Sequence, residues 1–380
     1  MQFEQYPFEK LSNLLEGITP NPTFTPSALT IGEPKFDTPQ FIQKCLKDSS
    51  ALLNKYPKSA GESYLKESMI QFVHTRFDVQ LQPNQLIPTF GTREVLFNFP
   101  QFYLFDKQDP TMAFTNPFYQ IYEGAAIATR SKIIHINLTK ENNFKATLSD
   151  DQLQVCDMVI LNFPNNPTSA SITKDELKTW VQKALKYDFI LINDECYSEL
   201  YFDESSKPSS LLEASIEVGN STFKNILVLN SISKRSSAPG LRSGFIAGDA
   251  VILKEYMKYR TYIGCAIPEP IQKAAAIAWR DEEHVNVFRD NYRQNFALAQ
   301  EILGITPPQA TFYIWLEVDD ELTFTQKLYQ EKNIKVLPGS FLGRGGIGKG
   351  YVRIALVENA KKTKEILLRL KEFINESTPA

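Results

Sequence analysis

The amino-acid sequence predicts an α/β fold in which helices cover a mainly parallel sheet, followed by a smaller α+β unit. From about residue 86, short apolar runs alternate with longer helical stretches. Valine, isoleucine and leucine fill several of these runs almost without alternation, as strands buried on both faces require. After about residue 250 this rhythm stops, so the C-terminal part is expected to form the second unit.

The elements follow in chain order. The first 40 residues are rich in proline, as in TPNPTFTPS, and this composition favours an extended arm over a helix. Six apolar runs are then predicted as strands: TMAFTN, KIIHINL, DMVILNFP, FILINDE, NILVLNSIS and SGFIAGD. Between the third and the fourth run, residues 173–188 have a helical pattern, and Thr173 with Glu176 forms a capping box at its start.

The C-terminal part has a different order of elements. Residues 281–303 are predicted as one long amphipathic helix, and residues 360–374 as a closing helix. Between them, ATFYIWLEV, IKVLPGSFL and GYVRIALV are predicted as strands. We therefore expect an arm over residues 1–40 that is part of a small domain, a large domain over 41–280, and a small C-terminal domain over 281–380.

Composition excludes several classes of protein. The chain has 380 residues, a net charge of −3 and no long basic or acidic block, so we expect no nucleic-acid partner. No window reaches the roughly 18 apolar residues of a membrane span, and the N-terminus lacks the apolar core of a signal peptide. The four cysteines are far apart and include no CxxC pair, which fits a reducing compartment. We expect a cytoplasmic protein.

In a parallel α/β sheet, ligands bind beyond the carboxyl ends of the strands. The segments at predicted strand ends are therefore the candidate site. They are GTRE (91–94), NPFYQIY (116–122), NFPNNPTS (162–169), NDECY (193–197) and SISK (231–234).

Lys234 follows a predicted strand within SISKRSSAPGLRSGF. A lone lysine is usually a solvated surface charge, but Ser231, Ser233 and Arg242 surround this one in the sequence. Neighbouring positive charge lowers the pKa of an amine and makes it a nucleophile toward a carbonyl. Serine hydroxyls and an arginine fork suit a phosphate. A Schiff-base lysine beside a phosphate site is what pyridoxal phosphate requires.

Asp194 ends the apolar run FILIND. It could be a helix cap or a turn residue, or it could pair with a buried pyridinium nitrogen and keep that ring an electron sink. Tyr197 and Asn166 could each bind the phenolic oxygen of such a ring, although PNNPT by itself is merely a good turn sequence.

Three further residues have two interpretations each, and a fourth, Arg353, has one. Thr92 and Arg93 could begin an ordinary helix, or their backbone N–H groups could bind phosphate. Tyr119 could be a packed core aromatic or could stack on a flat ring. Arg353 lies among apolar strand residues, where it needs an anionic partner such as a carboxylate.

Two other patterns are set aside. GRGGIGK (343–349) nearly matches a nucleotide-binding P-loop, but it lacks the final Ser or Thr and precedes a predicted strand instead of a helix. The three histidines are scattered, which supports neither a metal site nor a serine-type triad. No metal is expected.

In order and spacing, these segments resemble the fold-type I pyridoxal-phosphate aminotransferases of classes I and II. The resemblance runs from IGEPKFDTP through YPKSAGESYLKESM, NNPTS and NDECYSELY to SISKRSSAPGLRSGF and YVRIAL. It implies the type I transferase fold, with pyridoxal 5'-phosphate bound to the large domain. It also implies transamination between an amino acid and a 2-oxo acid.

The resemblance implies a role for each residue. Lys234 would link covalently to the cofactor, Asp194 would pair with the ring nitrogen, and Tyr119 would stack on the ring. Tyr197 and Asn166 would hold the ring oxygen. The phosphate would be held by Thr92, Arg93, Ser231, Ser233 and Arg242. Arg353 would hold the substrate α-carboxylate in a pocket that Gly32 also lines. Tyr56 matches a tyrosine that reaches the neighbouring subunit's phosphate, which implies a homodimer.

Two positions depart from the family pattern: Ser169 replaces a usual glycine, and Arg93 replaces a small or polar residue. Segments near the C-terminus, among them VLPGSFLGRGGIGKGYVRIALV, resemble the succinyldiaminopimelate aminotransferases of bacterial lysine biosynthesis. The acceptor expected from that resemblance is 2-oxoglutarate. The motifs equally allow an aspartate, alanine or aromatic aminotransferase, or a C–S β-lyase. A non-catalytic ligand sensor would need an attached DNA-binding module, for which we expect no room.

Overall fold

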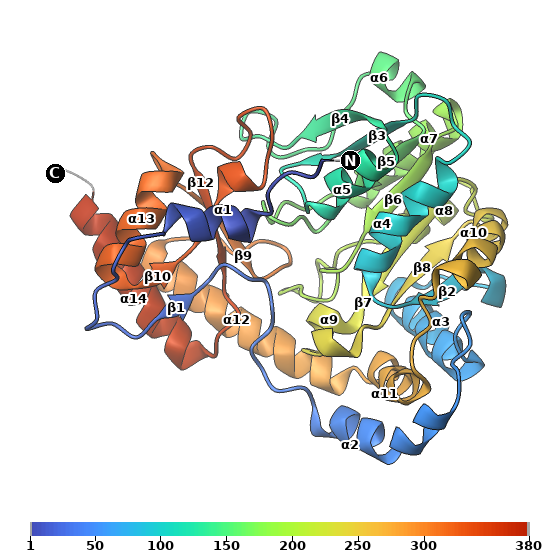
Figure 1. Ribbon diagram of the computed structural model, residues 1–380, viewed down its shortest axis with the longest axis horizontal. Coiled ribbons are helices and arrows are strands. Elements are labelled where there is room, and N and C mark those ends of the chain that lie inside the picture. The colour runs from blue at the N-terminus through green and yellow to red at the C-terminus, as the bar shows by residue number, and fades with distance from the viewer. Residues whose placement is uncertain (1, 378–380) are drawn as a thin grey trace.

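The computed structural model describes residues 2–377, and its centre is a seven-stranded sheet with helices on both faces (Figure 1). The strand order is β2-β8-β7-β6-β5-β3-β4. The strands from β7 to β4 are parallel, whereas β8 is antiparallel to both β7 and β2. The strands are β2 (Leu86–Thr89), β3 (Thr111–Asn116), β4 (Lys132–Asn137), β5 (Met158–Leu161), β6 (Ile190–Asp194), β7 (Ile226–Ser231) and β8 (Gly244–Gly248). The predicted α/β fold is confirmed, and β2 is a strand that the sequence patterns did not single out.

Alternate side chains of the central strands enter two separate cores. Val159 and Leu161 of β5 belong to one buried cluster, while Met158 and Ile160 belong to the other. This alternation follows from the two-residue period of a strand. The first cluster is covered by α3 (Ser63–Phe77), α7 (Lys174–Tyr187), α8 (Leu211–Glu217) and α11 (Glu269–Arg280). The second is covered by α4 (Thr92–Tyr103), α5 (Ile121–Ala128) and α10 (Ala250–Ile263).

A second, smaller sheet gathers the C-terminal strands. Its order is β11-β12-β9 and both pairings are antiparallel. The strands are β9 (Tyr313–Glu317), β11 (Leu337–Pro338) and β12 (Tyr351–Ala355). Beside it lie α12 (Glu283–Leu303), α13 (Glu321–Lys332) and α14 (Ala360–Ser377). In Figure 1, α12 extends from the neighbourhood of α11 into this orange and red unit.

The N-terminal segment packs against the C-terminal unit. Strand β1 (Ser27–Ala28) pairs in parallel with β10 (Ile334–Lys335). The expectation of an extended chain is wrong for α1 (Pro7–Leu14), because Pro7 stands at the helix start, where its missing N–H costs nothing. Leu11 and Leu15 cluster there with Leu337 and Leu342. Figure 1 shows blue α1 and β1 beside red and orange elements.

The remaining helices are short, and one predicted cap is confirmed. They are α2 (Gln40–Asp48), α6 (Asp150–Gln154) and α9 (Ile232–Arg235). At the start of α7, Thr173 and Glu176 form the predicted capping box. Among the helices of residues 2–377, none is long and apolar enough to cross a membrane.

Candidate active site

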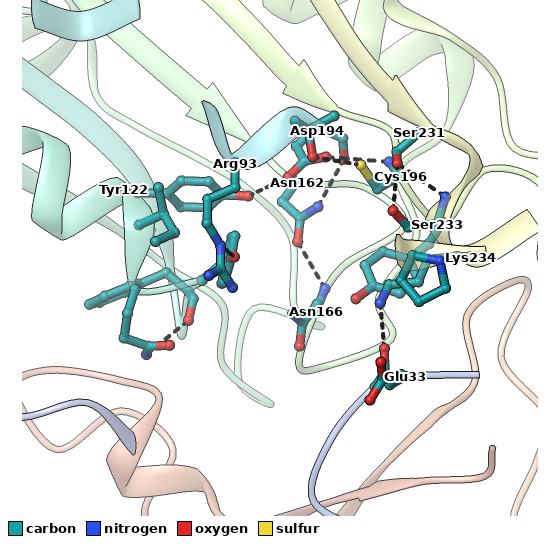
Figure 2. A pocket seen from close by; sticks show the side chains of 18 of the residues that line it. Glu33, Arg93, Tyr122, Asn162, Asn166, Asp194, Cys196, Ser231, Ser233 and Lys234 are labelled. Carbon is teal, nitrogen blue, oxygen red and sulfur yellow. Dashed lines mark hydrogen bonds between the residues drawn. The ribbon is translucent and has the colours of Figure 1, made fainter. Parts of the chain in front are cut away.

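The predicted site residues line one pocket of about 880 Å³, with the exception of Tyr56. They arrive from the carboxyl ends of β2, β3, β5, β6 and β7, and from β12 and the N-terminal segment. Because parallel strands end at the same edge of a sheet, residues far apart in sequence meet there. Figure 2 shows Arg93 and Tyr122 on one side of the cavity and Lys234 on the other.

Lys234 lies in the single-turn helix α9, immediately after β7. Ser231 begins that turn, since its hydroxyl accepts a hydrogen bond from the Ser233 N–H at 3.1 Å. The Lys234 ammonium donates to the Gly32 carbonyl. The pKa of Lys234 is lowered from 10.5 to about 8, mainly by burial and to a smaller extent by the nearby guanidinium groups of Arg353 and Arg242, while Cys196 and Glu33 oppose the shift. The lysine is therefore a nucleophile and base that needs little activation.

Asp194 ends β6 as a buried carboxylate. Its Oδ2 accepts from the Tyr122 hydroxyl at 3.0 Å, and its Oδ1 accepts from the Cys196 N–H at 3.4 Å. Burial raises the pKa of Asp194, although these hydrogen bonds and Lys234 oppose the rise. A buried carboxylate of this kind is stabilised in its charged form by a cationic N–H partner.

Asn162 joins two parts of the site, and the sequence patterns did not identify it. Its side chain donates to the Asp194 carbonyl at 2.8 Å and accepts from the Asn166 N–H at 2.9 Å. Tyr122 was missed as well. Both residues lie in the candidate strand-end segments. Asparagine in a turn and tyrosine in a helix are so common, however, that their residue types alone do not distinguish site residues from structural ones.

The start of α4 forms a cationic, donor-rich end of the pocket. Gly91 precedes the helix with φ +75°, and a Cβ added to it would lie 2.1 Å from Arg242 Nη2. Arg242 therefore packs directly against the helix start, and its side chain donates to the carbonyls of Pro239 and Phe90 at 3.0 and 3.3 Å. Thr92, Ser231 and Ser233 line the same pocket. Free helical N–H groups, hydroxyls and a guanidinium together suit a phosphate.

Arg353 extends from β12 into the pocket and is almost completely buried. Its Nη1 donates to Asn166 Oδ1 at 2.7 Å, and its Nη2 donates to the Thr30 carbonyl at 2.6 Å. Its Nε is buried without any hydrogen-bond partner among the described residues. Both partners are neutral, so the guanidinium charge still requires an anion.

Tyr313 is a further pocket residue that the sequence patterns missed. Its hydroxyl lies 3.1 Å from that of Tyr197, and the Arg353 guanidinium lies 4.5 Å from its ring centre. Burial raises the pKa of Tyr197 well above its usual value, so this phenol keeps its proton. A Cβ on Gly32 would lie 1.8 Å from the Tyr313 hydroxyl, so this approach requires glycine.

The structure also shows the positions of two predicted site residues, Arg93 and Tyr56, and of Ser169, which departs from the family pattern. Arg93 lines the pocket, but its side chain contacts Tyr119: Nε donates to the Tyr119 hydroxyl at 2.6 Å. Tyr56 lies outside the pocket and is fully exposed in this single chain. Ser169 adopts φ +59°, and its hydroxyl donates to the Tyr313 carbonyl at 2.8 Å, which ties this turn to β9.

The set-aside patterns do not form second sites. Strand β12 follows the GRGGIGK loop, so the helix of a P-loop is absent there. Ser236, His284 and Asp281 form a hydrogen-bonded chain, with 2.9 Å between Ser236 Oγ and His284 Nε2. Ser236 is completely buried, however, so it cannot serve as a nucleophile. Over residues 2–377, no cluster of His, Cys, Asp or Glu could hold a metal ion.

Comparison with known proteins agrees with this geometry. The model of the family "aminotransferase class I and II" matches residues 27–370. The structure of the aminotransferase AspB from Helicobacter pylori has 49% sequence identity, a TM-score of 0.96 and covers 100% of both chains. An aminotransferase structure from Neisseria meningitidis has 37% identity and a TM-score of 0.93, and covers 99% of this chain and 98% of its own.

Relatives with a named substrate are more distant. The LL-diaminopimelate aminotransferase of Aquifex aeolicus is 30% identical over 363 residues, which cover 91% of this chain and 90% of that protein. The corresponding enzyme of Maridesulfovibrio salexigens is 28% identical over 362 residues, which cover 91% of both. The chain belongs to the class I and II aminotransferase family and is a pyridoxal-phosphate-dependent aminotransferase.

Proposed function

We propose that the amino donor is N-succinyl-LL-2,6-diaminopimelate and that the acceptor is 2-oxoglutarate, in the synthesis of lysine through diaminopimelate. Two observations support this donor. C-terminal segments of the chain resemble succinyldiaminopimelate aminotransferases, and two relatives that cover most of the chain are named for LL-diaminopimelate. Aspartate, alanine and aromatic amino acids, or β-elimination of a C–S bond, would use the same residues.

The pocket residues fit pyridoxal phosphate at each of its functional groups. The observation that carries these roles, shared by all the candidate donors, is the meeting of Lys234, Asp194 and the unpaired Arg353 Nε in one pocket. Lys234 would bind the aldehyde carbon, and Asp194 would bind the ring nitrogen. Tyr197 and Asn166 would bind the ring oxygen, and Tyr119 would pack on the ring. The phosphate would be bound by Thr92, the Arg93 N–H, Ser231, Ser233 and Arg242.

When bound, pyridoxal phosphate supplies an aldehyde carbon that carries the amino group and a ring that accepts the electrons of a broken Cα–H bond. Arg353 binds the substrate α-carboxylate with its planar fork and thereby orients Cα, with Gly32 in the same wall. The neutral Lys234 Nζ would act as the general base that takes the Cα proton and, once charged, as the general acid that delivers this proton to the aldehyde carbon of the cofactor. Proton transfer by a positioned group contributes about 10²–10⁴-fold in rate. Donor and acceptor use the site in turn, which gives ping-pong kinetics.

This chemistry depends on the protonation states of Asp194 and Tyr197. The Asp194 carboxylate would hold a proton on the ring nitrogen. The Tyr197 hydroxyl remains protonated because its pKa is raised by burial, so it could donate a hydrogen bond to the ring oxygen. Since the pKa of Lys234 is lowered from 10.5 to about 8, a larger neutral fraction is available near neutral pH than an ordinary lysine would have.

We also infer that two copies share their active sites. Tyr56 is fully exposed, as are most of Tyr262 and Leu53, and an aromatic side chain gains by burial against a partner. The Tyr56 side chain would reach the phosphate end of the neighbouring pocket. The same proposal includes a cytoplasmic location and domain boundaries at residues 40 and 280.

A substitution at Lys234 and a panel of amino donors test this proposal. Lys234→Ala should abolish transamination and the yellow colour of the bound cofactor; a yellow, active variant would show that another lysine is used. The panel compares succinyldiaminopimelate, diaminopimelate, aspartate, alanine and phenylalanine with 2-oxoglutarate as acceptor. Absence of turnover with succinyldiaminopimelate would eliminate this donor and leave the aminotransferase assignment intact.

A further inference from the structure

We infer that the Arg93 guanidinium and the Tyr119 hydroxyl form a subsite for a second carboxylate, carried at the far end of the substrate side chain. The inference rests on the proposed function and deepens it, because it assigns the substrates to the amino acids and oxo acids with two acidic ends.

Arg93 has a cationic side chain whose hydrogen-bonding capacity is mostly unused. It is the second residue of α4, and its guanidinium carbon lies 5.7 Å from the centre of the Tyr119 ring. Its Nε donates to the Tyr119 hydroxyl at 2.6 Å. Within residues 2–377 the guanidinium has no acidic partner; the ionisable groups that interact with its charge are the phenols of Tyr119 and Tyr6 and the guanidinium of Arg242. Both terminal amino groups therefore remain free to donate.

Tyr119 adds another donor at the same place. Its hydroxyl oxygen already accepts from Arg93, so its own proton is available to an acceptor in the pocket. Burial raises the pKa of Tyr119, which keeps that proton in place. The remaining N–H donors of this guanidinium and the proton of this phenol match the several lone pairs of a carboxylate.

The acidic residue nearest to Arg93 in the sequence forms an ion pair with a different arginine. Glu94 follows Arg93, but its carboxylate is paired with Arg260, with 2.8 Å to Nε and 3.2 Å to Nη2. It also accepts from the Phe90 N–H at 2.7 Å. Arg93, which is exposed to solvent, therefore has no acidic partner from this part of the pocket wall and can exchange water for an anion.

A phosphate is the other anion that Arg93 could serve, and the geometry favours the carboxylate. The phosphate donors gather around Arg242 and the backbone at Gly91. The Arg93 guanidinium is close enough to Arg242 to lower the pKa of that group, but its Nε donates to Tyr119, which follows β3 on a different loop. Phe97, one turn further along α4, and Ile121 line the wall nearby and suit the methylene chain between two carboxylates.

Inert ligands test the subsite without turnover. Glutarate and pentanoate have carbon chains of the same length, but glutarate has two carboxylates and pentanoate has one. Their dissociation constants would be read from the absorbance of the bound cofactor. The native holoenzyme should prefer glutarate, and Arg93→Gln should lose roughly tenfold to a hundredfold of that preference. Pentanoate binding and the affinity for the cofactor should stay unchanged. Arg280→Gln, which removes an exposed arginine outside the pocket, is the matched control.

Two further variants separate the possible outcomes. Arg93→Lys should retain part of the glutarate preference through its charge, and Tyr119→Phe should lose a smaller part. An Arg93→Gln protein with weakened cofactor binding and intact glutarate preference would overturn the inference and assign the side chain to the phosphate. The inference would also be overturned if Arg93→Gln had the same cofactor affinity and the same glutarate preference as the native protein. A failed donor panel refutes the proposed donor alone, since these titrations do not depend on turnover.

Discussion

Arg353 of the smaller sheet donates a hydrogen bond from Nη1 to Oδ1 of Asn166, in a loop of the larger unit, across 2.7 Å. Asn166 follows β5 of the seven-stranded sheet, and Arg353 belongs to β12 of the smaller one. This contact joins the two units at the pocket and orients the guanidinium, whose Nε is still without a partner among the described residues.

Arg353→Lys should therefore weaken substrate binding more than it slows the chemical step. Lysine keeps the charge but cannot contact Asn166, Thr30 and a carboxylate at once. We expect the KM for the amino donor to rise roughly tenfold to a hundredfold, with a smaller change in kcat. Steady-state kinetics would check this, and an unchanged KM would move the α-carboxylate site elsewhere.

Lys234→Met should stabilise the cofactor-free protein at neutral pH. The folded-state pKa of Lys234 is lowered to about 8, below its ordinary value of 10.5, so the folded chain disfavours the charged amine. This cost is complete below pH 8 and disappears as the pH approaches 10.5. Allowing for partial exposure of the side chain, we expect a gain of about 2 kcal/mol in the free energy of unfolding at pH 7.

Urea unfolding at pH 7 and pH 10 would measure this gain. Lys254→Met, at an exposed position on α10, is the control and should change stability little at either pH. If the Lys234 variant had the same advantage at both values, the depressed pKa would not be its cause.

Gly32→Ala should damage both stability and substrate binding. The added Cβ would lie 1.8 Å from the Tyr313 hydroxyl and 2.8 Å from Phe312 Cε2, so Tyr313 must move away from Tyr197. Overpacking of this kind costs about 1–3 kcal/mol. Thermal unfolding and kcat/KM should both fall. Gly240→Ala, which meets no atom within 4 Å, should be tolerated; equal behaviour of the two variants would contradict the close approach.

Glu123→Gln should loosen the attachment of the 343–350 loop. Arg344 from this loop forms a two-pronged ion pair with Glu123 of α5, at 2.8 and 2.6 Å, and the two side chains are only 21% and 11% exposed. Loss of the charge should cost about 1–3 kcal/mol and speed hydrogen exchange in the loop.

A second ion pair between the two units is the control for this effect. Lys140 and Glu317 are 2.7 Å apart, but their side chains are 64% and 60% exposed. Lys140→Gln should therefore cost about 0–1 kcal/mol in the free energy of unfolding. Equal losses from the two substitutions would show that burial does not strengthen the Arg344 pair.

Local sequence patterns were sufficient for the sheet and for much of the candidate site. Continuous apolar runs predicted the strands β3 to β8, because a strand buried on both faces has no polar alternation. The strand-end rule then selected the segments that contain Lys234, Asp194 and Asn166. These inferences succeed because they depend only on neighbours along the chain and on one general property of parallel sheets.

The tertiary structure alone decided the contacts between those segments. Tyr313 is a site residue because β9 lies beside Gly32, and Asn162 is one because the loop after β5 lies beside Asp194. The contact between Arg93 and Tyr119 likewise joins two segments that are distant in the sequence. Proline composition likewise failed to predict α1, whose Leu11 and Leu15 are held by Leu337 and Leu342. The physical reason is that such contacts arise from packing between residues distant in sequence, which short-range patterns do not encode.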